Sequence, residues 1–337
     1  MDYKAPKWMP GGHVQTIWPA LFGRRRWAPA MPLQRERWPT PDGDFVDVDK
    51  QVASHSSRPL LVLFHGLEGS SASHYAQAFA DWAAEQDIHL ALPHFRGCSG
   101  ELNLAPRAYH SGDHEEIDWI LQRLRTEHRA QGGATLVAAG VSLGGNALMR
   151  WAAQCGGTAA EHADAVASIC SPLDLMASGL SIGQGLNRKI YTPMFLRSMK
   201  PKALAKWAQH PGLFDKAAMM AAQDLYAFDN VFTAPVHGFK DTQDYWARAS
   251  AKPLMAEIRI PALALNALND PFVPASSLPR QQDVSRQVTL WQPSHGGHVG
   301  FPKGPWPTHV RGLPDAVGQW LLQAAGVNSN PMETAHG

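Results

Sequence analysis

The sequence predicts an α/β fold with a mostly parallel central sheet, helices on both faces and a mostly helical insertion that caps it. Two observations predict this class. Continuous apolar runs alternate with amphipathic helical patterns along most of the 337 residues, as expected for parallel strands that are buried on both faces. Between about residues 172 and 250 the alternation stops, and Met and aromatic residues occur without any strand-like run.

The predicted strands begin with a hairpin. Two strand-like runs within residues 36–52 flank Asp42-Gly43, a dipeptide that favours a tight turn. The apolar runs that follow have the composition of buried strands. They are residues 59–66, 88–95, 134–141, 163–170, 260–268 and 287–292.

The spacing of apolar residues predicts two helices between these strands. Tyr75, Phe79 and Trp82 share one face of the first helix. The second helix is predicted over residues 113–129. Its buried stripe consists of Ile117, Ile120, Leu121 and Leu124.

The start of the second helix has two interpretations. His110 and His114 are four residues apart and would place two metal ligands on one helical face. Asp113 followed by Glu116 instead matches a capping box, in which side chains bind the free N–H groups of the first turn. We favour the capping box and predict no metal site.

These patterns divide the chain into a core and an insertion. We expect the α/β core over residues 34–171 and 251–330, and the helical cap over residues 172–250. Residues 1–33 are rich in Pro, Trp and Gly and lack periodicity, so we expect an N-terminal arm packed on the body. Residues 331–337 are expected to form a tail.

Composition argues against several classes of function. With 30 Lys and Arg against 29 Asp and Glu, the chain lacks the positive charge that binds nucleic acid. Its three cysteines are scattered and have no metal-finger spacing, which favours a reducing compartment. The N-terminus does not resemble a secretory signal, and no apolar run approaches the ~20 residues that span a bilayer. We therefore expect a cytoplasmic protein without an integral membrane segment.

A serine flanked by glycines follows one of the buried strands. Gly140, Ser142 and Gly144 form a Gly-x-Ser-x-Gly pattern between a strand and a helix. The glycines would allow a tight turn, with the serine merely capping the helix. The same pattern at this junction is typical of a nucleophile elbow, which exposes a serine oxygen to substrate. Because ligands bind at the carboxyl edge of open α/β sheets, the position favours the elbow.

A serine nucleophile needs a base, and the base needs an acid that orients it. Asp270 lies just past the strand-like run 260–268 and is the predicted acid. The neighbouring Asn269 cannot carry the charge that stabilises an imidazolium. The elbow hypothesis therefore predicts that Ser142 and Asp270 lie on loops at one edge of the sheet.

The predicted base is a histidine after the last strand. His295 and His298 both lie in the segment that follows residues 287–292. We favour His298, because Gly296 and Gly297 precede it and would let the loop fold its side chain over the serine.

An acyl-transfer site also needs hydrogen-bond donors for the oxyanion. The backbone N–H of Leu143, first in the helix after the serine, is one predicted donor. The second is the N–H of Leu67, which follows His65-Gly66 in the loop after the strand-like run 59–66. His65 itself is interpreted as part of the loop architecture.

Several long motifs occur together in a fixed order, and in them the chain resembles the YheT-type branch of the α/β-hydrolase superfamily. Members of this branch are esterases related to the abhydrolase-domain lipases and phospholipases of animals. The resemblance runs from about residue 8 to 325. It rests on "GGHVQTIWP", "HGLEGSSASHY", "PHFRGCSGELNLAPRAYHSGD", "GVSLGGNALMRW", "FTAPVHGFKDTQDYW" and "HGGHVGFP".

The resemblance implies a carboxylic-ester hydrolase with a charge-relay triad, carried here onto Ser142, Asp270 and His298. Family members often have Asp-Asp-Pro where this chain has Asn269-Asp270-Pro271. That departure leaves a single acid at the position.

The resulting expectation is a serine esterase for short or medium acyl chains, with a small-molecule ester as substrate and no cofactor. Acyltransferase or thioesterase activity would use the same residues, and a non-catalytic binding protein on this scaffold is a further alternative. Apolar residues of the cap would line an acyl pocket, or would pack the cap's own small core. They are Met194, Phe195, Met199, Phe228 and Phe232. The sequence does not predict an oligomeric state.

Overall fold

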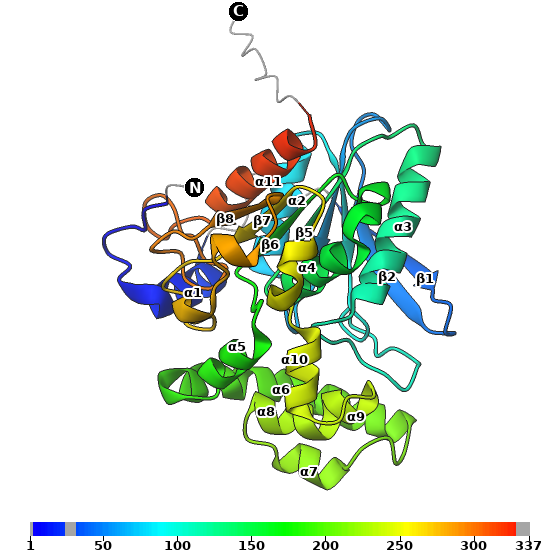
Figure 1. Cartoon of the computed structure of the whole chain (residues 1–337), viewed down its shortest axis with the longest axis vertical. Helices are drawn as coiled ribbons and strands as arrows, with labels where there is room; N and C mark the ends of the chain where they lie inside the picture. Colours follow the sequence, from blue (N-terminus) through cyan, green and yellow to red (C-terminus); the bar gives the residue numbers. More distant parts are fainter. Residues whose placement is uncertain (1–2, 24–31, 328–337) are drawn as a thin grey trace, which may run out of the picture.

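An eight-stranded sheet forms the centre of the computed structural model, which describes residues 3–23 and 32–327. Its strand order is β1-β2-β4-β3-β5-β6-β7-β8 (Figure 1). The pairs β1–β2 and β2–β4 are antiparallel, and all other pairs are parallel. The strands are β1 (Gln34–Pro39), β2 (Phe45–Gln51), β3 (Leu60–Phe64), β4 (His89–Pro93), β5 (Leu136–Val141), β6 (Ala165–Ile169), β7 (Ala262–Leu265) and β8 (Val288–Trp291). The predicted fold class is confirmed.

The first two strands form the predicted hairpin. Pro39 pairs with Phe45 across the turn, and Gly43 adopts a φ of 78°. This left-handed conformation is open to glycine without a steric penalty. The Asp42-Gly43 signal therefore marks the turn as expected.

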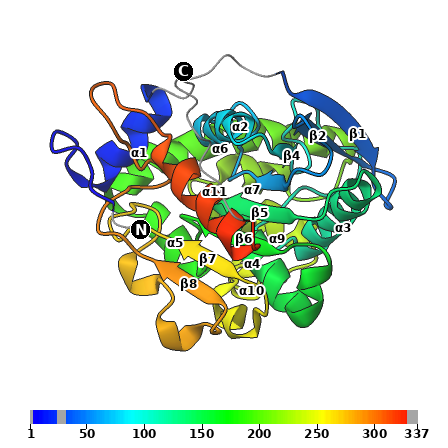
Figure 2. The same cartoon turned by 90° about the horizontal axis from the view of Figure 1, so that it is seen from above.

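Helices cover both faces of the sheet (Figure 2). On one face lie α2 (His74–Glu85) and α11 (Gly312–Ala324), and on the other lie α3 (His114–Ala130) and α4 (Leu143–Cys155). The strands β3, β4, β5, β6 and β7 are buried along their whole length. Burying each large aliphatic side chain stabilises the fold by about 1.5–3 kcal/mol relative to exposure, so the apolar runs of the sequence become the core.

The predicted capping box at the start of α3 is wrong. Asp113 is the residue before the helix, but its side chain makes no capping hydrogen bond and pairs with Arg107 instead. Glu116 pairs with the buried guanidinium of Arg96. A buried cation left without a partner is costly. These carboxylates therefore form ion pairs with the arginines and do not cap the N–H groups of the helix. The predicted stripe of apolar residues on α3 is buried as expected.

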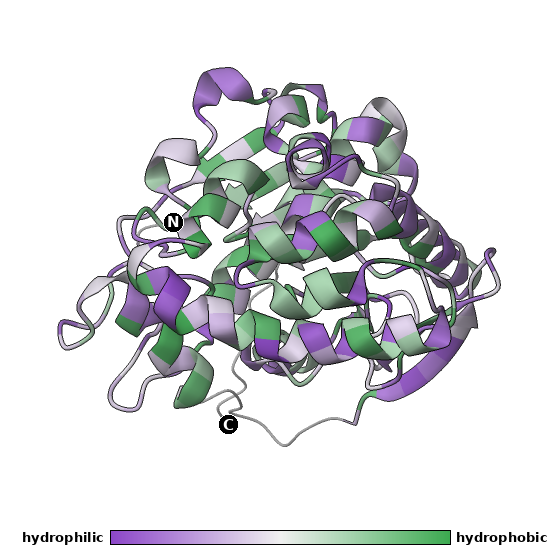
Figure 3. Ribbon diagram, turned by 90° about the horizontal axis from the view of Figure 1, so that it is seen from below, coloured by the Kyte–Doolittle hydropathy of each residue, from purple (hydrophilic) through white to green (hydrophobic). Residues whose placement is uncertain are grey.

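The chain between β6 and β7 forms a layer of helices beyond the carboxyl edge of the sheet (Figure 1). These are α5 (Leu175–Ile182), α6 (Gly185–Gln209), α7 (Lys216–Ala221), α8 (Leu225–Phe228), a π-helical turn η2 (Asp229–Thr233), α9 (Ala234–Val236) and α10 (Thr242–Ala249). Hydrophilic and hydrophobic residues are mixed along these helices (Figure 3). We call this layer the cap. Its own core contains Leu196, Ala203, Phe214, Met219, Ala222, Leu225, Phe228 and Phe232.

The described part of the N-terminal arm contains one helix, α1 (Gly11–Leu21), which no periodicity predicted. Tyr3 donates a hydrogen bond to the carbonyl of Pro302 at 2.7 Å, which ties the arm to the segment after β8. Residues 1–2 and 24–31 of the expected arm, and the expected tail, residues 331–337, lie outside the described residues. Short 3₁₀ turns complete the chain: η1 (Gly156–Glu161), η3 (Lys252–Glu257), η4 (Ala275–Ser277) and η5 (Gln281–Asp283).

Candidate active site

Ser142 stands at a sharp turn between β5 and α4. Its backbone has φ 52° and ψ −118°, a conformation that costs a non-glycine residue energy and persists only where the surroundings impose it. Its N–H donates to the carbonyl of Ile169 at 2.8 Å, so the ladder with β6 holds the turn. This is the geometry of a nucleophile elbow.

The glycines around Ser142 provide space rather than flexibility. A Cβ at Gly140 would lie 2.5 Å from the carbonyl oxygen of Gly144, and one at Gly145 would lie 2.0 Å from Oγ of Ser171. Any side chain at these positions would push α4 away from the sheet. The start of α4 therefore packs tightly behind the serine because the motif is glycine-rich.

The structure brings Ser142, His298 and Asp270 together from three loops. Nε2 of His298 lies 3.0 Å from Oγ of Ser142, and Nδ1 of His298 lies 2.8 Å from Oδ2 of Asp270. The side chain of His298 is 10% exposed and that of Asp270 is 0% exposed. With Nδ1–H donated to the carboxylate, Nε2 is free to accept the serine proton.

Asp270 is held by its own loop. Its Oδ1 accepts hydrogen bonds from the N–H groups of Phe272 at 2.7 Å and Val273 at 3.2 Å, which leaves Oδ2 for His298. The ring of Phe272 lies 4.2 Å from that of His298, centroid to centroid. Phe272 is a neighbour of the imidazole that sequence reasoning missed, because nothing in the local pattern marks it.

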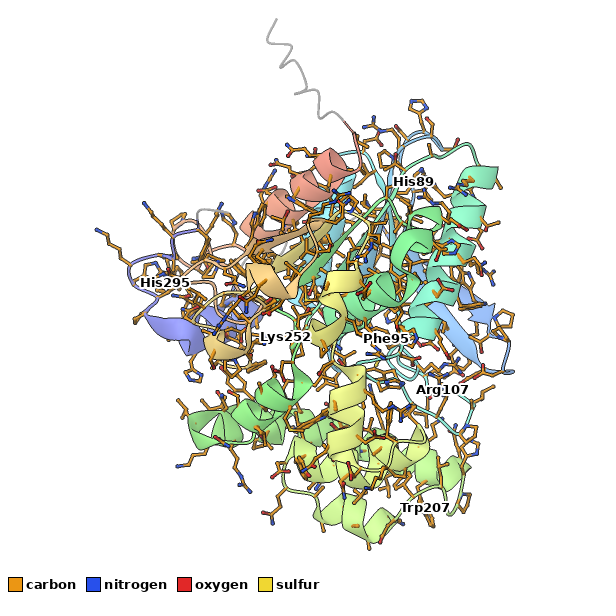
Figure 4. The ribbon with its side chains drawn as sticks, in the orientation of Figure 1. His89, Phe95, Arg107, Trp207, Lys252 and His295 are labelled. Carbon is orange, nitrogen blue, oxygen red and sulfur yellow. The ribbon has the colours of Figure 1, made fainter. Side chains whose placement is uncertain are left out.

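The competing histidine lies apart from this group. His295 is exposed on the loop after β8 and stands at the periphery of the molecule (Figure 4). Its neighbour Gly296 turns back at φ 149°, and the chain then enters the site at His298. The structure thus brings His298, and not His295, to the serine.

Both predicted oxyanion donors lie beside Ser142. Leu67 and Leu143 line the same cavity as Ser142, and a Cβ on Gly66 would lie 3.2 Å from the Cβ of Ser142. Leu143 opens α4, where the first N–H groups lack intrahelical partners. Among the described residues, neither N–H has a hydrogen-bond partner. Both groups remain available to a substrate oxygen.

The loop that carries Leu67 is anchored on either side of it. The N–H of Gly66 donates to the hydroxyl of Tyr75 at 2.9 Å, and that of Glu68 donates to the hydroxyl of Tyr109 at 2.8 Å. His65 accepts the N–H of Phe95 at Nε2, at 3.0 Å. Burial lowers the pKa of His65 to about 3, so it is a neutral structural residue of this loop, as predicted.

Two residues of α1 reach the same site, and sequence reasoning missed them. The hydroxyl of Thr16 accepts the N–H of His298 at 2.8 Å, and Oε1 of Gln15 accepts the N–H of Gly296 at 2.9 Å. Asn269 donates to the same Gln15 oxygen at 2.9 Å. The motif "GGHVQTIWP" contains both residues, and its adjacent Gln-Thr pair in an apolar setting was the available signal.

A cavity lies between Ser142 and the cap. It encloses about 1140 Å³ including its open mouth, and its walls are mostly apolar. Four of the five predicted pocket residues line it, and two of these also belong to the cap's own core, so both interpretations apply to them. The four are Phe195, Met199, Phe228 and Phe232.

The prediction for Met194 is wrong. Its side chain is 52% exposed and does not line the cavity. Consecutive residues of a helix point about 100° apart, so when Phe195 of α6 faces the cavity its neighbour faces away from it. Composition of the segment suggested Met194, but the register of α6 excludes it.

A half-buried carboxyl group also lines this cavity. Asp229 opens the π-helical turn of the cap and accepts hydrogen bonds from the hydroxyl of Thr233 at 2.6 Å and from Nε1 of Trp246 at 2.9 Å. Burial raises its pKa to about 6, and the two hydrogen bonds offset only part of that shift. The carboxyl is thus held in place but costly to ionise.

Asp229→Asn should change how stability depends on pH. A carboxyl whose pKa is raised in the folded state stabilises the fold fully below its unfolded pKa of 3.8, and the contribution is lost as pH rises through about 6. The shift corresponds to about 3 kcal/mol. Between pH 4 and 7 the wild type should lose most of this amount relative to the variant, measured by denaturant unfolding. Asp244→Asn, on the surface of α10, is the control, and an unchanged difference across this range would contradict the expectation.

The histidines that suggested a metal pair make backbone contacts. Nδ1 of His110 accepts the N–H of Gly112 at 3.1 Å, and Nδ1 of His114 contacts the carbonyl of the same residue at 3.1 Å. Burial lowers the pKa of His110 to about 3. Within residues 3–23 and 32–327, no group of three or more His, Cys, Asp or Glu is placed to hold a metal ion. In the same residues, no helix has the length and apolar character needed to cross a membrane.

Comparison with known proteins adds independent information. Residues 59–305 match the family described as the alpha/beta hydrolase fold. The candidate esterase YheT of Escherichia coli is 35% identical over 314 residues, which cover 92% of this chain and 89% of YheT. Human phospholipase ABHD3 is 28% identical over 334 residues, covering 96% of this chain and 78% of that protein.

Solved structures share the fold. The crystal structure of the alpha/beta hydrolase GrgF from a Penicillium species superimposes with a TM-score of 0.59 at 13% identity, covering 88% of this chain and 100% of GrgF. The sequence match to YheT, the family match and the strand order therefore all indicate an α/β hydrolase. The chain belongs to the α/β-hydrolase family, in its YheT-type branch.

Proposed function

We propose that this protein hydrolyses carboxylic esters through a covalent acyl-enzyme on Ser142. The observation that carries the proposal is the continuous relay from the Ser142 hydroxyl through the His298 imidazole to the buried Asp270 carboxylate, with contacts of 3.0 and 2.8 Å. The strained turn at Ser142 supports it, because such strain clusters at functional sites. The names of the relatives, an esterase and a phospholipase, agree with an ester as substrate.

In the first half of the reaction, His298 takes the hydroxyl proton as the Ser142 oxygen attacks the ester carbonyl. The carbonyl oxygen becomes an oxyanion that the N–H groups of Leu143 and Leu67 stabilise. The intermediate then collapses: the C–O bond to the alcohol breaks, and His298 gives its proton to the departing alkoxide. Each oxyanion donor of this kind is typically worth about 10²–10³ in rate.

In the second half, water replaces the alcohol. His298 takes a proton from water, the hydroxide attacks the acyl carbon, and the proton returns to Ser142 as the carboxylic acid leaves. Asp270 stabilises the imidazolium that forms in each half without taking its proton. The residues need no cofactor for these steps.

The cavity indicates which part of the substrate is recognised. Its apolar walls suit an acyl chain, for which we keep the expected short or medium length. Each buried methylene contributes about 0.8 kcal/mol. For the wild type, kcat/KM should therefore rise about fourfold per methylene until the chain fills the cavity.

Phe195→Ala should move this limit to longer chains. Phe195 lines the cavity and its ring lies 5.9 Å from that of Phe272, next to the reacting groups. Removing the ring lengthens the space available, so the chain length with the highest kcat/KM should increase. A panel of p-nitrophenyl esters measures this limit. Met194→Ala, the exposed neighbour on the same helix, is the matched control, and an equal shift in both variants would contradict the assignment of the cavity.

The proposed function is tested by two measurements on the purified protein. A fluorophosphonate probe should label Ser142, as identified by peptide mapping, and p-nitrophenyl esters should be hydrolysed with a burst of released phenol if deacylation is slow. Parallel assays with acyl-CoA thioesters, and with an added alcohol acceptor, separate ester hydrolysis from thioester hydrolysis and acyl transfer. A protein that is neither labelled nor active on any of these would overturn the proposal.

A further inference from the structure

The loop that carries His298 is rich in glycine, a composition that by itself favours flexibility. Gly296, Gly297 and Gly300 surround the histidine, and Val299 adopts a φ of 59°. Glycines widen the conformations open to a chain. An imidazole that must stay within hydrogen-bond reach of a serine and a carboxylate therefore needs support from outside its own loop.

The helix α1 supplies that support through two side chains. Thr16 accepts the N–H of His298 itself, while its own hydroxyl proton is donated to the carbonyl of Gly12 at 2.7 Å. Gln15 accepts the N–H of Gly296, and its amide donates to the carbonyl of Met9 at 2.8 Å. Gln15 is 1% exposed, so its orientation is fixed and water does not compete for it.

The same helix also holds the loop of the acid. Asn269, next to Asp270, donates to the Gln15 oxygen and accepts the N–H of Gly297 at 3.0 Å. The loops of the base and of the acid are thus joined to each other, and to α1, by hydrogen bonds that meet at Gln15.

Backbone packing shows how closely α1 lies against both loops. A Cβ on Gly12 would lie 1.8 Å from the carbonyl oxygen of Asn269, and a Cβ on Gly300 would lie 1.7 Å from that of Gln15. Neither loop has space to move toward α1. The helix α1 therefore limits the movement of the loops that carry His298 and Asp270.

We propose that Thr16 and Gln15 are positioning residues, which hold the His298 loop so that its imidazole reaches Ser142 and Asp270 together. The N-terminal arm is then a working part of the active site rather than a covering of the body. The inference rests on the proposed function, because a positioning role has meaning only if the relay is catalytic.

Thr16→Val tests this inference because valine keeps the shape and removes the acceptor. The N–H of His298 loses its partner, and misplacement of a catalytic group by a fraction of an ångström slows the reaction. We expect kcat to fall about tenfold with KM little changed, and the rate of fluorophosphonate labelling at Ser142 to fall by a similar factor. Thr16→Ser, which keeps the hydroxyl, should restore both rates.

Two controls separate positioning from general stability. Thr126 on α3 makes the same kind of bond to the carbonyl four residues earlier, at 2.8 Å, and is exposed, so Thr126→Val removes an equivalent hydroxyl away from the site. Ile120→Val lowers stability through the buried stripe of α3. Both should keep the wild-type kcat. Thermal unfolding of every variant checks that the folded fraction is the same in the assay, and Thr16→Ala replaces Thr16→Val if valine prevents folding.

The outcomes distinguish this inference from the proposed function. If the wild type is neither labelled nor active, the proposed function fails. If the wild type reacts at Ser142 and a folded Thr16→Val protein reacts equally fast, the positioning role is wrong while the proposed function stands. The positioning role is established if Thr16→Val lowers kcat and the labelling rate at Ser142 while KM is unchanged, and Thr16→Ser restores both rates.

Discussion

Ser142→Ala is expected to lower kcat/KM for ester substrates by at least about 10⁴-fold while leaving the fold intact. The substitution removes the only oxygen in contact with Nε2 of His298 among the described residues, so no acyl-enzyme can form. Alanine is smaller than serine and fits the turn, although the backbone stays in its strained conformation.

The measurement is turnover of the preferred p-nitrophenyl ester, together with fluorophosphonate labelling and circular dichroism. Ser54→Ala is the matched control, because this exposed serine binds Asp87 at the surface and lies outside the cavity. A folded Ser142→Ala protein that still hydrolyses esters at the wild-type rate would end the acyl-enzyme mechanism.

Asp270→Asn is expected to lower kcat by about 10⁴-fold. The amide is nearly the same size as the carboxylate, and its oxygen can still accept the N–H groups of Phe272 and Val273. Its NH₂ would then face Nδ1 of His298 and would favour the tautomer whose proton is on Nε2. In that tautomer the imidazole presents a donor to Ser142 and cannot take its proton.

The kcat of the variant should be measured over a range of pH, with Asp244→Asn as the control for an Asp-to-Asn change away from the cavity. Loss of activity at all pH values, with an unchanged far-UV spectrum, is the expected result. A decrease of less than tenfold would show that the carboxylate does not orient the base, and the role of Asp270 would have to be reassigned.

The sequence could predict Ser142, Asp270 and His298 as a group because each lies in the segment that follows a predicted strand. Parallel strands end at one edge of the sheet, so residues far apart in the chain are brought together there by topology alone. The hairpin at Asp42-Gly43 and the buried stripe of α3 were equally accessible, since both depend on local patterns.

Other features depend on contacts that leave no local signal. Thr16 and Gln15 act through the backbone of a loop at the other end of the chain, and the helix that carries them shows no apolar periodicity. Met194 and Phe195 are both large apolar residues and are adjacent in the chain. Only the direction in which each points from α6 distinguishes them. The predicted capping box at Asp113 failed because Arg107, six residues earlier, and Arg96, 20 residues before Glu116, take the two carboxylates as partners.

The cap leaves the sheet after β6 and returns to it at β7, and these two strands are neighbours. An insertion whose ends lie side by side can change in length and content while the strands keep their pairing. Ser142, Asp270 and His298 all lie outside it. Under the proposed function, the reacting groups lie outside residues 172–250, and these residues line the cavity together with loops of the core. Exchanging residues 172–250 between relatives should therefore change the selectivity for the acyl chain and leave the relay in place.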